Sequence, residues 1–527
     1  MDSVSHTTIL AGLVATTVFT IRRRWTRSQS QLPLPPGPPS YPLIEQLLSM
    51  PLSSEHTVFD KQGKEIQSDI ISLSMLGNTI IVLNSSQAAI DLLEKKSSIY
   101  SDRVCPPMIL EPTLMDWSNY VALLPYGSRW KEHRRMMHTW LQKGATRSFQ
   151  TSQQRQARLL LIRLLDSNST LDDQFYRTIA ATLLRSVYGY ELERLDDHFV
   201  AGAKEAIDNL ARAAMSTNFL VNAFPVLARV PDWFPWTQWK GTARSFREQK
   251  NSIMNETFQW TKDQIAKGTN EPSIVRSLLE SGSSAEIGKE ELEDYVKHIA
   301  IALFGAGSDT TVSSLKTFVL AMLLFPECQS KAQAEIDRVI GSSRLPTFED
   351  RDQLPYITNL INEVMRWQPV TPLAVPHACT QDDVYRNYRI PKGAIVIGNV
   401  WSMSRNEDVY KDPESFNPDR FLDPQVPKIP AFGFGRRFLD PQVPKIPAFG
   451  FGRRLCPGIH YAEASIFITI VSILAAYTIT KAKGKNGQEI TPSTEGVAES
   501  VVYHPKPFKC VFTPRSDSHR ELILGEA

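Results

Sequence analysis

The stretch of this chain that most constrains its fold is a short glycine-rich loop that carries a single cysteine. Residues 449–458 read Phe-Gly-Phe-Gly-Arg-Arg-Leu-Cys-Pro-Gly, and a largely apolar run follows over residues 459–476. The glycines let the backbone pass close to another group, and Pro457 suits the first turn of a helix. We therefore expect a sharp turn at Cys456, followed by a helix whose positive dipole end lies beside the sulfur and favours the thiolate.

The sequence that precedes this loop occurs twice in the chain. Residues 421–437, FLDPQVPKIPAFGFGRR, recur without a mismatch as residues 438–454. The second copy leads to Cys456, whereas the first copy runs into the second and reaches no thiol. Identical tandem copies indicate a recent duplication or a fault in sequence assembly. We expect the first copy to be an insertion that the fold does not need.

The composition argues against several classes of protein. The 527 residues carry a formal net charge of +2, which gives no indication of a nucleic-acid partner. Apolar residues make up 42% of the chain, which is enough for a large core. The five cysteines are scattered without a Cys-x-x-Cys pair, which argues against a disulfide framework and against a cysteine-rich zinc site.

The N-terminus has the pattern of an uncleaved membrane anchor. Residues 1–21 reach the length needed to span a bilayer with Asp2 as their only charge, and residues 22–24 are three arginines. A cleaved signal peptide carries its positive charges before the apolar run, whereas here they follow it. We therefore expect residues 1–31 to form a single-pass anchor with a basic flank and to leave the rest of the chain in the cytosol.

A proline-rich segment follows this anchor. Six of the eleven residues over 32–42 are proline, which excludes a helix or a central strand and predicts a stiff, extended hinge. No second segment of this composition occurs further along the chain. Residues 43–527 are therefore expected to form one folded body.

The patterning of this body predicts a mainly α fold with a minor β-sheet. Strand-like runs occur at residues 70–76, 79–83 and 394–400. A helix over residues 290–325 would be about 54 Å long at 1.5 Å per residue, long enough to cross the domain. Further helices are predicted over residues 151–166, 172–190, 198–215, 244–267, 328–340, 356–367 and 457–479.

The residues around Cys456 make a specific pattern. A lone cysteine is commonly a small buried hydrophobic residue. Here, however, Phe449, Gly452, Arg454 and Gly458 frame it at the spacing F-x-x-G-x-R-x-C-x-G, which resembles the haem-binding signature of the cytochrome P450 family. The resemblance implies that Cys456 ligates the iron of haem b and that the four framing residues bind the cofactor. It also implies the P450 fold, with a long central helix over the haem.

A second motif lies inside the long predicted helix. Residues 306–311 read Ala-Gly-Ser-Asp-Thr-Thr, and most of these are poor helix formers, so we expect a local distortion here. A kink without a function is the alternative interpretation. The segment also resembles the family's oxygen-activation motif, A-G-x-D/E-T-T. That resemblance implies that Thr310 holds bound dioxygen and a water molecule, while Asp309 helps relay protons.

A charged pair indicates the scaffold near the cysteine. Glu363 and Arg366 lie three residues apart on one face of the helix predicted over 356–367. On a surface such a pair would contribute about 0–1 kcal/mol. The family instead buries an E-x-x-R pair and bridges it to a later arginine, which the segment FNPDRF supplies as Arg420. By this resemblance the three residues have a structural role and hold the pocket on its cysteine side.

Two further matches concern the carboxylates of the haem. Trp130 and Arg134 match the family's W-x-x-x-R helix, and a guanidinium suits a propionate through paired hydrogen bonds. His377 stands where many relatives carry a second propionate-binding residue, although a capping or surface histidine is the alternative. A basic face on the cysteine side would attract an acidic reductase, unless it is ordinary solvated surface. We expect this face to comprise Lys131, Arg134, Arg135, Arg453 and Arg454.

The resemblance as a whole implies a membrane-bound monooxygenase of the endoplasmic reticulum. It looks most like microsomal fungal members of secondary metabolism, driven by O2 and NADPH through a separate cytochrome P450 reductase, with cytochrome b5 as a further candidate partner. The alternatives are a thiolate-haem isomerase or dehydratase and a non-catalytic haem-binding protein. A mostly apolar pocket predicts a lipophilic small-molecule substrate. The segments expected to line it are residues 106–115, 219–224, 303–307, 370–375 and 496–501.

Overall fold

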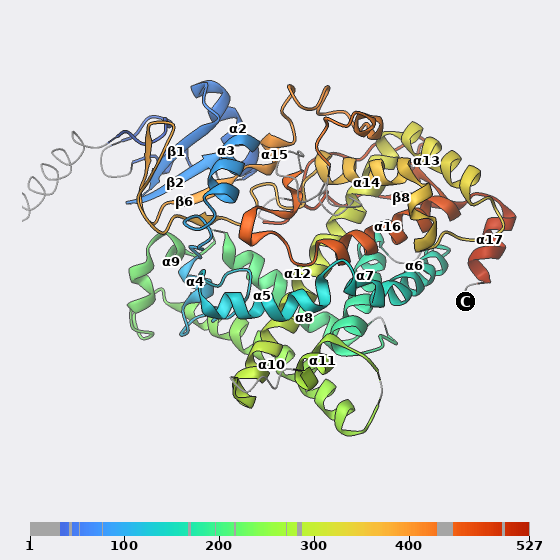
Figure 1. Cartoon of the computed structure of the whole chain (residues 1–527), viewed down its shortest axis with the longest axis horizontal. Helices are drawn as coiled ribbons and strands as arrows, with labels where there is room; N and C mark the ends of the chain where they lie inside the picture. The colour runs from blue at the N-terminus through green and yellow to red at the C-terminus, as the bar shows by residue number, and fades with distance from the viewer. Residues whose placement is uncertain are drawn as a thin grey trace, which may run out of the picture.

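A computed structural model of the chain is drawn in Figure 1. The predicted membrane anchor, residues 1–31, lies outside the residues that the structure describes, and so do residues 429–445, which span the junction of the two copies. The described ranges are residues 32–41, 45–51, 53–75, 77–166, 170–194, 196–215, 218–269, 271–281, 287–428, 446–497 and 501–525.

A small sheet lies at one end of the body, opposite the C-terminal helix α17 (Asp517–Leu524) (Figure 1). Its strands run in the order β1 (Ile70–Met75), β2 (Asn78–Leu83), β6 (Ile395–Gly398) and β3 (His377–Ala378). β1 and β2 form an antiparallel pair, β2 is parallel to β6, and β3 is antiparallel to β6. The three predicted strand runs are the three main strands of this sheet.

Two further pairs of strands lie elsewhere in the body. β4 (Asp383–Tyr385) pairs with β5 (Tyr388–Ile390), and β7 (Tyr477–Lys481) pairs with β8 (Cys510–Pro514). Both pairs are antiparallel. Neither pair was predicted from the sequence. Residues 477–479 were assigned to the helix predicted over 457–479, and residues 383–390 and 510–514 were assigned to no element.

Helices make up most of the molecule, which confirms the mainly α fold. The helix α16 (Ile459–Ala476) is shorter than predicted because Tyr477 enters β7, and Pro457 lies outside it. The other helices are α2 (Glu55–Ile66), α3 (Ser86–Ala89), the π-helix η2 (Ile90–Lys95), α4 (Pro107–Leu110), α5 (Ser128–Leu141), α6 (Gln150–Leu164), α7 (Leu171–Tyr188), α8 (His198–Ala214), α9 (Leu220–Ala223), α10 (Gln238–Ala266), α11 (Ile274–Ser281), α12 (Lys289–Leu324), α13 (Pro326–Val339), α14 (Pro355–Trp367) and α15 (Val400–Met403).

The long helix α12 crosses the centre of the molecule, and it is not distorted where the sequence predicts a distortion. The backbone stays α-helical through residues 306–311. Neighbouring helices explain why, since a Cβ at Gly305 would lie 2.3 Å from Ile207 Cδ1 and one at Gly307 would lie 3.1 Å from Leu183 Cδ1. The glycines therefore allow α7 and α8 to approach α12 closely, and this packing outweighs weak helix propensity.

The core surrounds α12, α14 and α16. Among the described residues, α16 is the one unbroken helix long and apolar enough to cross a membrane, yet 89% of it is buried inside the protein. It packs against α6 and α12, as Figure 1 also shows. The apolar run after Cys456 is therefore a core helix that anchors the cysteine loop.

The proline-rich segment is attached to the body and does not stand apart from it as a spacer. The backbone N–H of Ser72 in β1 donates to the carbonyl of Pro36 at 2.9 Å, and that of Arg389 donates to Pro33 at 2.8 Å. An extended segment leaves its backbone carbonyls free to accept such bonds, since proline itself has no N–H to donate. The described part of the segment, residues 32–41, therefore runs along the sheet end of the protein.

Candidate active site

The cysteine loop has the tight turn that its glycines predict. The backbone N–H of Cys456 donates to the carbonyl of Phe449 at 2.9 Å and closes the turn. Gly452 has a φ of 51°, and a Cβ at this position would lie 2.3 Å from the carbonyl oxygen of Leu93 in η2. A side chain at residue 452 would therefore push the loop away from η2 and displace Cys456.

The sulfur of Cys456 lies just before the first turn of α16, whose N-cap is Gly458. A Cβ built on Gly458 would lie 3.9 Å from Cys456 Sγ, so the backbone there runs close to the thiol. Burial raises the pKa of the thiol, whereas the backbone N–H of Gly458 and the charge of Arg134 lower it. Both opposing groups stabilise the thiolate, which is the form that ligates a metal.

Arg454 is buried and fixed on two sides. Its Nε donates to the carbonyl of Ser101 and its Nη2 to that of Leu124, each at 2.7 Å, and the guanidinium lies 4.6 Å from the ring centre of Trp130. Burial lowers its pKa to about 10, so it remains charged at neutral pH. Its Nη1 has no partner among the described residues. A buried charged donor of this kind fits an anionic ligand.

Arg134 completes this arrangement from α5. Its guanidinium lies 5.6 Å from a ring centre of Trp130, and the charge of Cys456 acts on it. The structure therefore brings together Trp130, Arg134, Arg454 and Cys456, which sequence reasoning had placed at one site.

His377 is buried nearby, but it offers no charge. Its Nδ1 lies 2.7 Å from the carbonyl oxygen of Tyr100, which means that Nδ1 carries the proton and donates it. Burial lowers its pKa to about 3, and the charges of Arg103 and Arg454 act in the same direction. The imidazole is therefore neutral at pH 7 and is no basic residue in this arrangement.

Arg103 places a further buried positive charge beside His377. Its Nη1 donates to the carbonyls of Val375 and Pro376, each at 2.6 Å, and burial lowers its pKa to about 9. Arg103 was not predicted as a site residue, because neither it nor the residues next to it in the sequence belong to a motif of fixed spacing.

Three guanidinium groups thus converge on the region beside the cysteine loop. Besides burial, the charge of Arg454 lowers the pKa of Arg103, and the charge of Arg134 lowers the pKa of Arg454. The carboxylate of Asp102 raises the pKa of both Arg103 and Arg454. Gathering buried like charges is unfavourable unless an anion compensates them. The donor set therefore fits a cofactor that carries two carboxylates, as haem does.

The charged scaffold predicted near the cysteine is assembled in the interior. Glu363 and Arg366 are both fully buried and form two hydrogen bonds, of 2.7 and 2.8 Å. Arg420 Nε donates to the same carboxylate at 3.0 Å. Arg366 also donates to the carbonyls of Ser404 and Pro413, so the triad ties α14 to the segment that leads to the cysteine loop.

The motif on α12 presents one accessible face. Ala306 is exposed although most side chains of this helix are buried, and Leu303, Gly307 and Thr310 are partly accessible. These four positions share one side of a helix. Thr310 Oγ1 donates to the carbonyl of Ala306 at 2.6 Å, which leaves its oxygen free to accept a hydrogen bond. Asp309 Oδ1 lies 3.0 Å from Nε2 of His504, a residue that sequence reasoning did not single out.

The expected basic face is smaller than predicted. Arg454 is buried, so it cannot belong to a surface. Lys131 and Arg453 are exposed and lie 5.3 and 5.2 Å from the ring centre of Tyr126, while Arg135 is paired with Glu132. The exposed part of the face is therefore centred on Tyr126.

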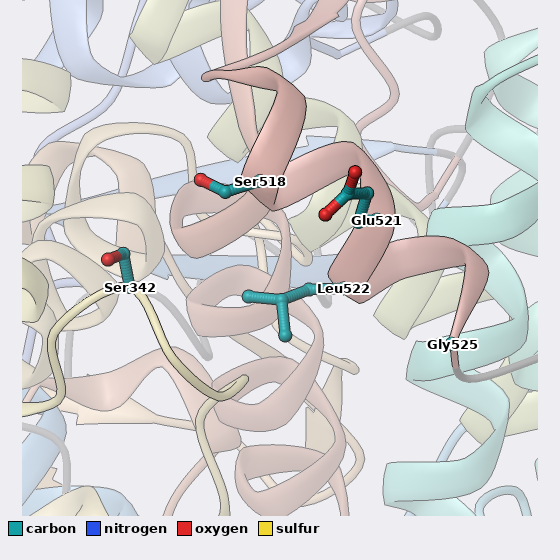
Figure 2. Close-up of a pocket in the computed structure, with 5 residues that line it drawn as sticks. All are labelled: Ser342, Ser518, Glu521, Leu522 and Gly525. Atoms are coloured by element: carbon teal, nitrogen blue, oxygen red, sulfur yellow. The ribbon is translucent and has the colours of Figure 1, made fainter.

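A shallow hollow lies elsewhere, between α17 and the turn after α13, and Figure 2 shows the side chains around it. None of the candidate site residues lines it. Its lining residues are Ser342, Ser518, Glu521, Leu522 and Gly525.

Known proteins resemble this chain over nearly its whole length. The family model described as Cytochrome P450 matches residues 35–512. A cytochrome P450 monooxygenase of Armillaria gallica is 37% identical over all of both chains. Cytochrome P450 monooxygenase 98 of Postia placenta is 38% identical over 98% of this chain and 96% of its own.

Solved structures resemble the fold. A zebra fish cytochrome P450, in a structure with abiraterone, has a TM-score of 0.69 at 23% identity, covering 88% of this chain and all of its own. A structure with progesterone has a TM-score of 0.70 at 22% identity, covering 87% and 99% of the two chains. At this identity the likeness concerns the fold. Together with the sequence matches, it shows that this chain belongs to the cytochrome P450 family and is a haem-thiolate monooxygenase.

Proposed function

We propose that this chain oxidises a lipophilic small molecule with O2 and electrons from NADPH, and that Cys456 is the axial ligand of its haem iron. The observation that carries this proposal is the thiol at the start of α16, where the Gly458 N–H and Arg134 both favour the thiolate. A thiolate-ligated haem supplies the electron density that favours cleavage of the O–O bond.

Around the thiolate, Phe449, Gly452 and Gly458 would keep the loop close to the cofactor. Arg103, Arg134 and Arg454 would hold its propionates. Trp130 would keep two of these guanidinium groups in place, because both stack on its ring. His377 would contribute packing and a fixed hydrogen bond to Tyr100, with no charge of its own.

Asp309 and Thr310 would transfer protons on the side of the cofactor site opposite Cys456. Reduction of one oxygen atom of O2 to water consumes two protons, and these must reach a site from which bulk water is largely excluded. The hydroxyl of Thr310 donates its hydrogen to the carbonyl of Ala306, so the Thr310 oxygen can accept a further hydrogen bond. The neighbouring carboxylate of Asp309 can carry a proton. Glu363, Arg366 and Arg420 take no part in this chemistry and hold the loop in place.

Hydrogen bonds link some of the substrate segments proposed from the sequence to distant parts of the chain. Met108 N donates to Asn222 Oδ1 at 3.2 Å, which joins residues 106–115 to residues 219–224. Tyr503 N donates to the carbonyl of Val370 at 2.8 Å, which brings the C-terminal segment beside residues 370–375. The largely apolar character of these segments supports a lipophilic substrate. A role in fungal secondary metabolism is part of this proposal, and its support is that the similar monooxygenases come from fungi.

Electrons would come from NADPH–cytochrome P450 reductase, with cytochrome b5 as a further donor. Lys131 and Arg453 supply exposed positive charge beside the cysteine loop, which suits an acidic partner. Charge reversal at both positions should raise the reductase concentration needed for half-maximal NADPH oxidation. An unchanged dependence on reductase and on salt would place the docking surface elsewhere.

The protein would act at the endoplasmic reticulum membrane, with its catalytic body in the cytosol. Besides the apolar N-terminal residues, the segment after α9 exposes Trp233 by 81% and Trp236 by 83%. Tryptophan is enriched at membrane interfaces. Serine at both positions should weaken sedimentation of the chain with phospholipid vesicles, and wild-type binding by that variant would contradict this contact.

The test of the activity is Thr310→Ala. A monooxygenase should continue to consume NADPH with a competent reductase while it releases more hydrogen peroxide per NADPH. Unchanged coupling in the variant would contradict the monooxygenase assignment. Product that forms without NADPH and O2 would favour a thiolate-haem isomerase or dehydratase, whereas a wild type that neither consumes NADPH nor forms product would favour a non-catalytic haem-binding protein.

A further inference from the structure

The candidate proton carrier on α12 has a basic partner from the far end of the chain. His504 Nε2 lies 3.0 Å from Asp309 Oδ1, and both side chains are partly accessible, at 18% and 29%. The two residues are separated by almost 200 positions in the sequence. An imidazole at this distance can share a proton with the carboxylate, and histidine is the side chain whose charge ordinarily changes near neutral pH.

The segment that carries His504 is held against α12 by its backbone. Ser313 Oγ, one turn beyond Asp309 on α12, donates to the carbonyl of Tyr503. The N–H of Tyr503 donates to Val370, and the N–H of Val497 donates to the carbonyl of His504 at 2.8 Å. The backbone of His504 is therefore fixed without its side chain, which leaves the imidazole free to act on Asp309.

An exposed carboxylate lies near this pair. Asp208 on α8 is exposed, and the charges of Asp309 and His504 both act on its carboxylate. Burial raises the pKa of Asp208, and so does Asp309, whereas His504 lowers it. The other ionisable groups that face this cluster are Lys204 and Arg212 on α8, Tyr176 on α7, and Tyr120.

We propose that His504 is the residue that supplies protons to Asp309 from the solvent beside Asp208. The imidazolium gives its Nε2 proton to Asp309 Oδ1, and once Asp309 has passed that proton on, the vacant Nε2 takes a new proton from solvent water. No electrons move in this step, and one proton passes per cycle of the imidazole. His504 acts through Asp309, so it is a positioning residue, and the inference rests on the proposed monooxygenase function.

A purely structural contact would behave differently. If His504 only fastened the C-terminal segment, a non-titrating partner would replace it. Lysine keeps a positive charge but does not titrate near pH 7, and glutamine keeps a donor without a charge. Neither can both give up and regain a proton over the neutral range.

The experiment uses the full-length holoenzyme with NADPH–cytochrome P450 reductase. NADPH oxidation is measured from pH 6 to 8.5 in H2O and in D2O for the wild type, His504→Gln, His504→Lys, Asp309→Asn and the double variant H504Q/D309N. H504Q should reduce NADPH oxidation at least fivefold and increase the solvent isotope effect. H504K should not restore the wild-type pH profile, and the double variant should be no slower than D309N.

A second readout separates this step from electron delivery and folding. The rate at which the reductase forms the ferrous carbon monoxide complex requires no proton from Asp309, so it should be unchanged in H504Q. His519→Gln, on α17, is the matched control and should behave as the wild type. A wild-type rate and isotope effect in H504Q, or a double variant whose losses multiply, would overturn the inference while the function stands. A wild type that oxidises no NADPH would overturn both.

Discussion

At the scale of single residues, Arg454 connects the cysteine loop to the rest of the site. It follows Gly452 by two positions, yet its guanidinium reaches the carbonyls of Ser101 and Leu124 and the ring of Trp130. One side chain therefore ties the loop, the segment before α4 and the start of α5 together. Its Nη1, which has no hydrogen-bond partner in the part of the chain that the structure describes, is the atom that a bound propionate would satisfy.

We predict that Arg454→Lys weakens both the fold and the binding of haem. An ammonium on a flexible stem cannot make both carbonyl bonds and also stack on Trp130, and the loss of one charged hydrogen bond costs about 2 kcal/mol. Urea unfolding should show a loss of this size, and the haem content per protein should fall. Arg453→Lys, at the exposed neighbouring position, is the control. Equal effects of the two substitutions would contradict the role of Arg454.

The site residues that could be predicted from the sequence are those that belong to a motif of fixed spacing. Cys456, Arg454, Trp130 and Arg134 were found in this way, and the structure brings them together. Arg103 and His504 were missed because each meets the site through contacts between distant segments. Burial, which no single residue type reveals, keeps the imidazole of His377 neutral, and its role toward a propionate stays a prediction.

At the scale of elements, the repeated segment has an unexpected geometry at its ends. The backbone N–H of Ile446 donates to the carbonyl of Lys428 at 3.0 Å, so the described chain on either side of residues 429–445 is already adjacent. Ile446 is buried in the core. Because the copies are identical, removal of residues 429–445 produces the same chain as removal of residues 421–437.

We predict that this 17-residue deletion preserves the fold and haem incorporation. Closing a loop of this length costs on the order of 2 kcal/mol of chain entropy, so the shorter chain should be at least as stable. Urea unfolding and the haem content would measure this. A matched deletion of 17 residues over 446–462 removes the cysteine loop and should abolish haem binding. Loss of haem from the 429–445 deletion would show that the insertion is needed.

The elements also show where local sequence rules fail. The three main strands and most of the long helices could be predicted from their apolar patterning, whereas α2, α11 and α17 were not predicted. The distortion expected in α12 did not follow, because Ile207 and Leu183 pack against its glycines and tertiary contact decides the conformation. The pairs β4–β5 and β7–β8 were missed because residues 477–479 were assigned to the end of a helix and residues 383–390 and 510–514 to no element.

At the scale of the whole molecule, buried histidines couple stability to pH. Burial lowers the pKa of His56 and His133 to about 4 and that of His377 to about 3. Each takes up a proton in the unfolded chain near pH 6.5 but not in the folded protein. Their contribution to stability is therefore present above pH 6.5 and is lost as the pH falls. Burial raises the pKa of Glu55 and of Glu463, which act in the opposite sense.

We predict that His133→Gln makes unfolding less dependent on acid. One histidine of this kind contributes about 1.4 kcal/mol per pH unit between about pH 6 and pH 4.5. Urea unfolding of the holoenzyme across this range should give a slope smaller by that amount in the variant. An unchanged slope would show that His133 is protonated in the folded protein.

Cys456, among the five cysteines, is the residue proposed to ligate the haem iron. The ferrous carbon monoxide difference spectrum of the full-length protein tests this assignment, since the long-wavelength Soret band requires a thiolate ligand. We predict that Cys456→Ser removes this band, while serine at Cys105, Cys328, Cys379 or Cys510 leaves it in place. A band that survives in C456S, or that disappears with one of the other four cysteines, would contradict the account.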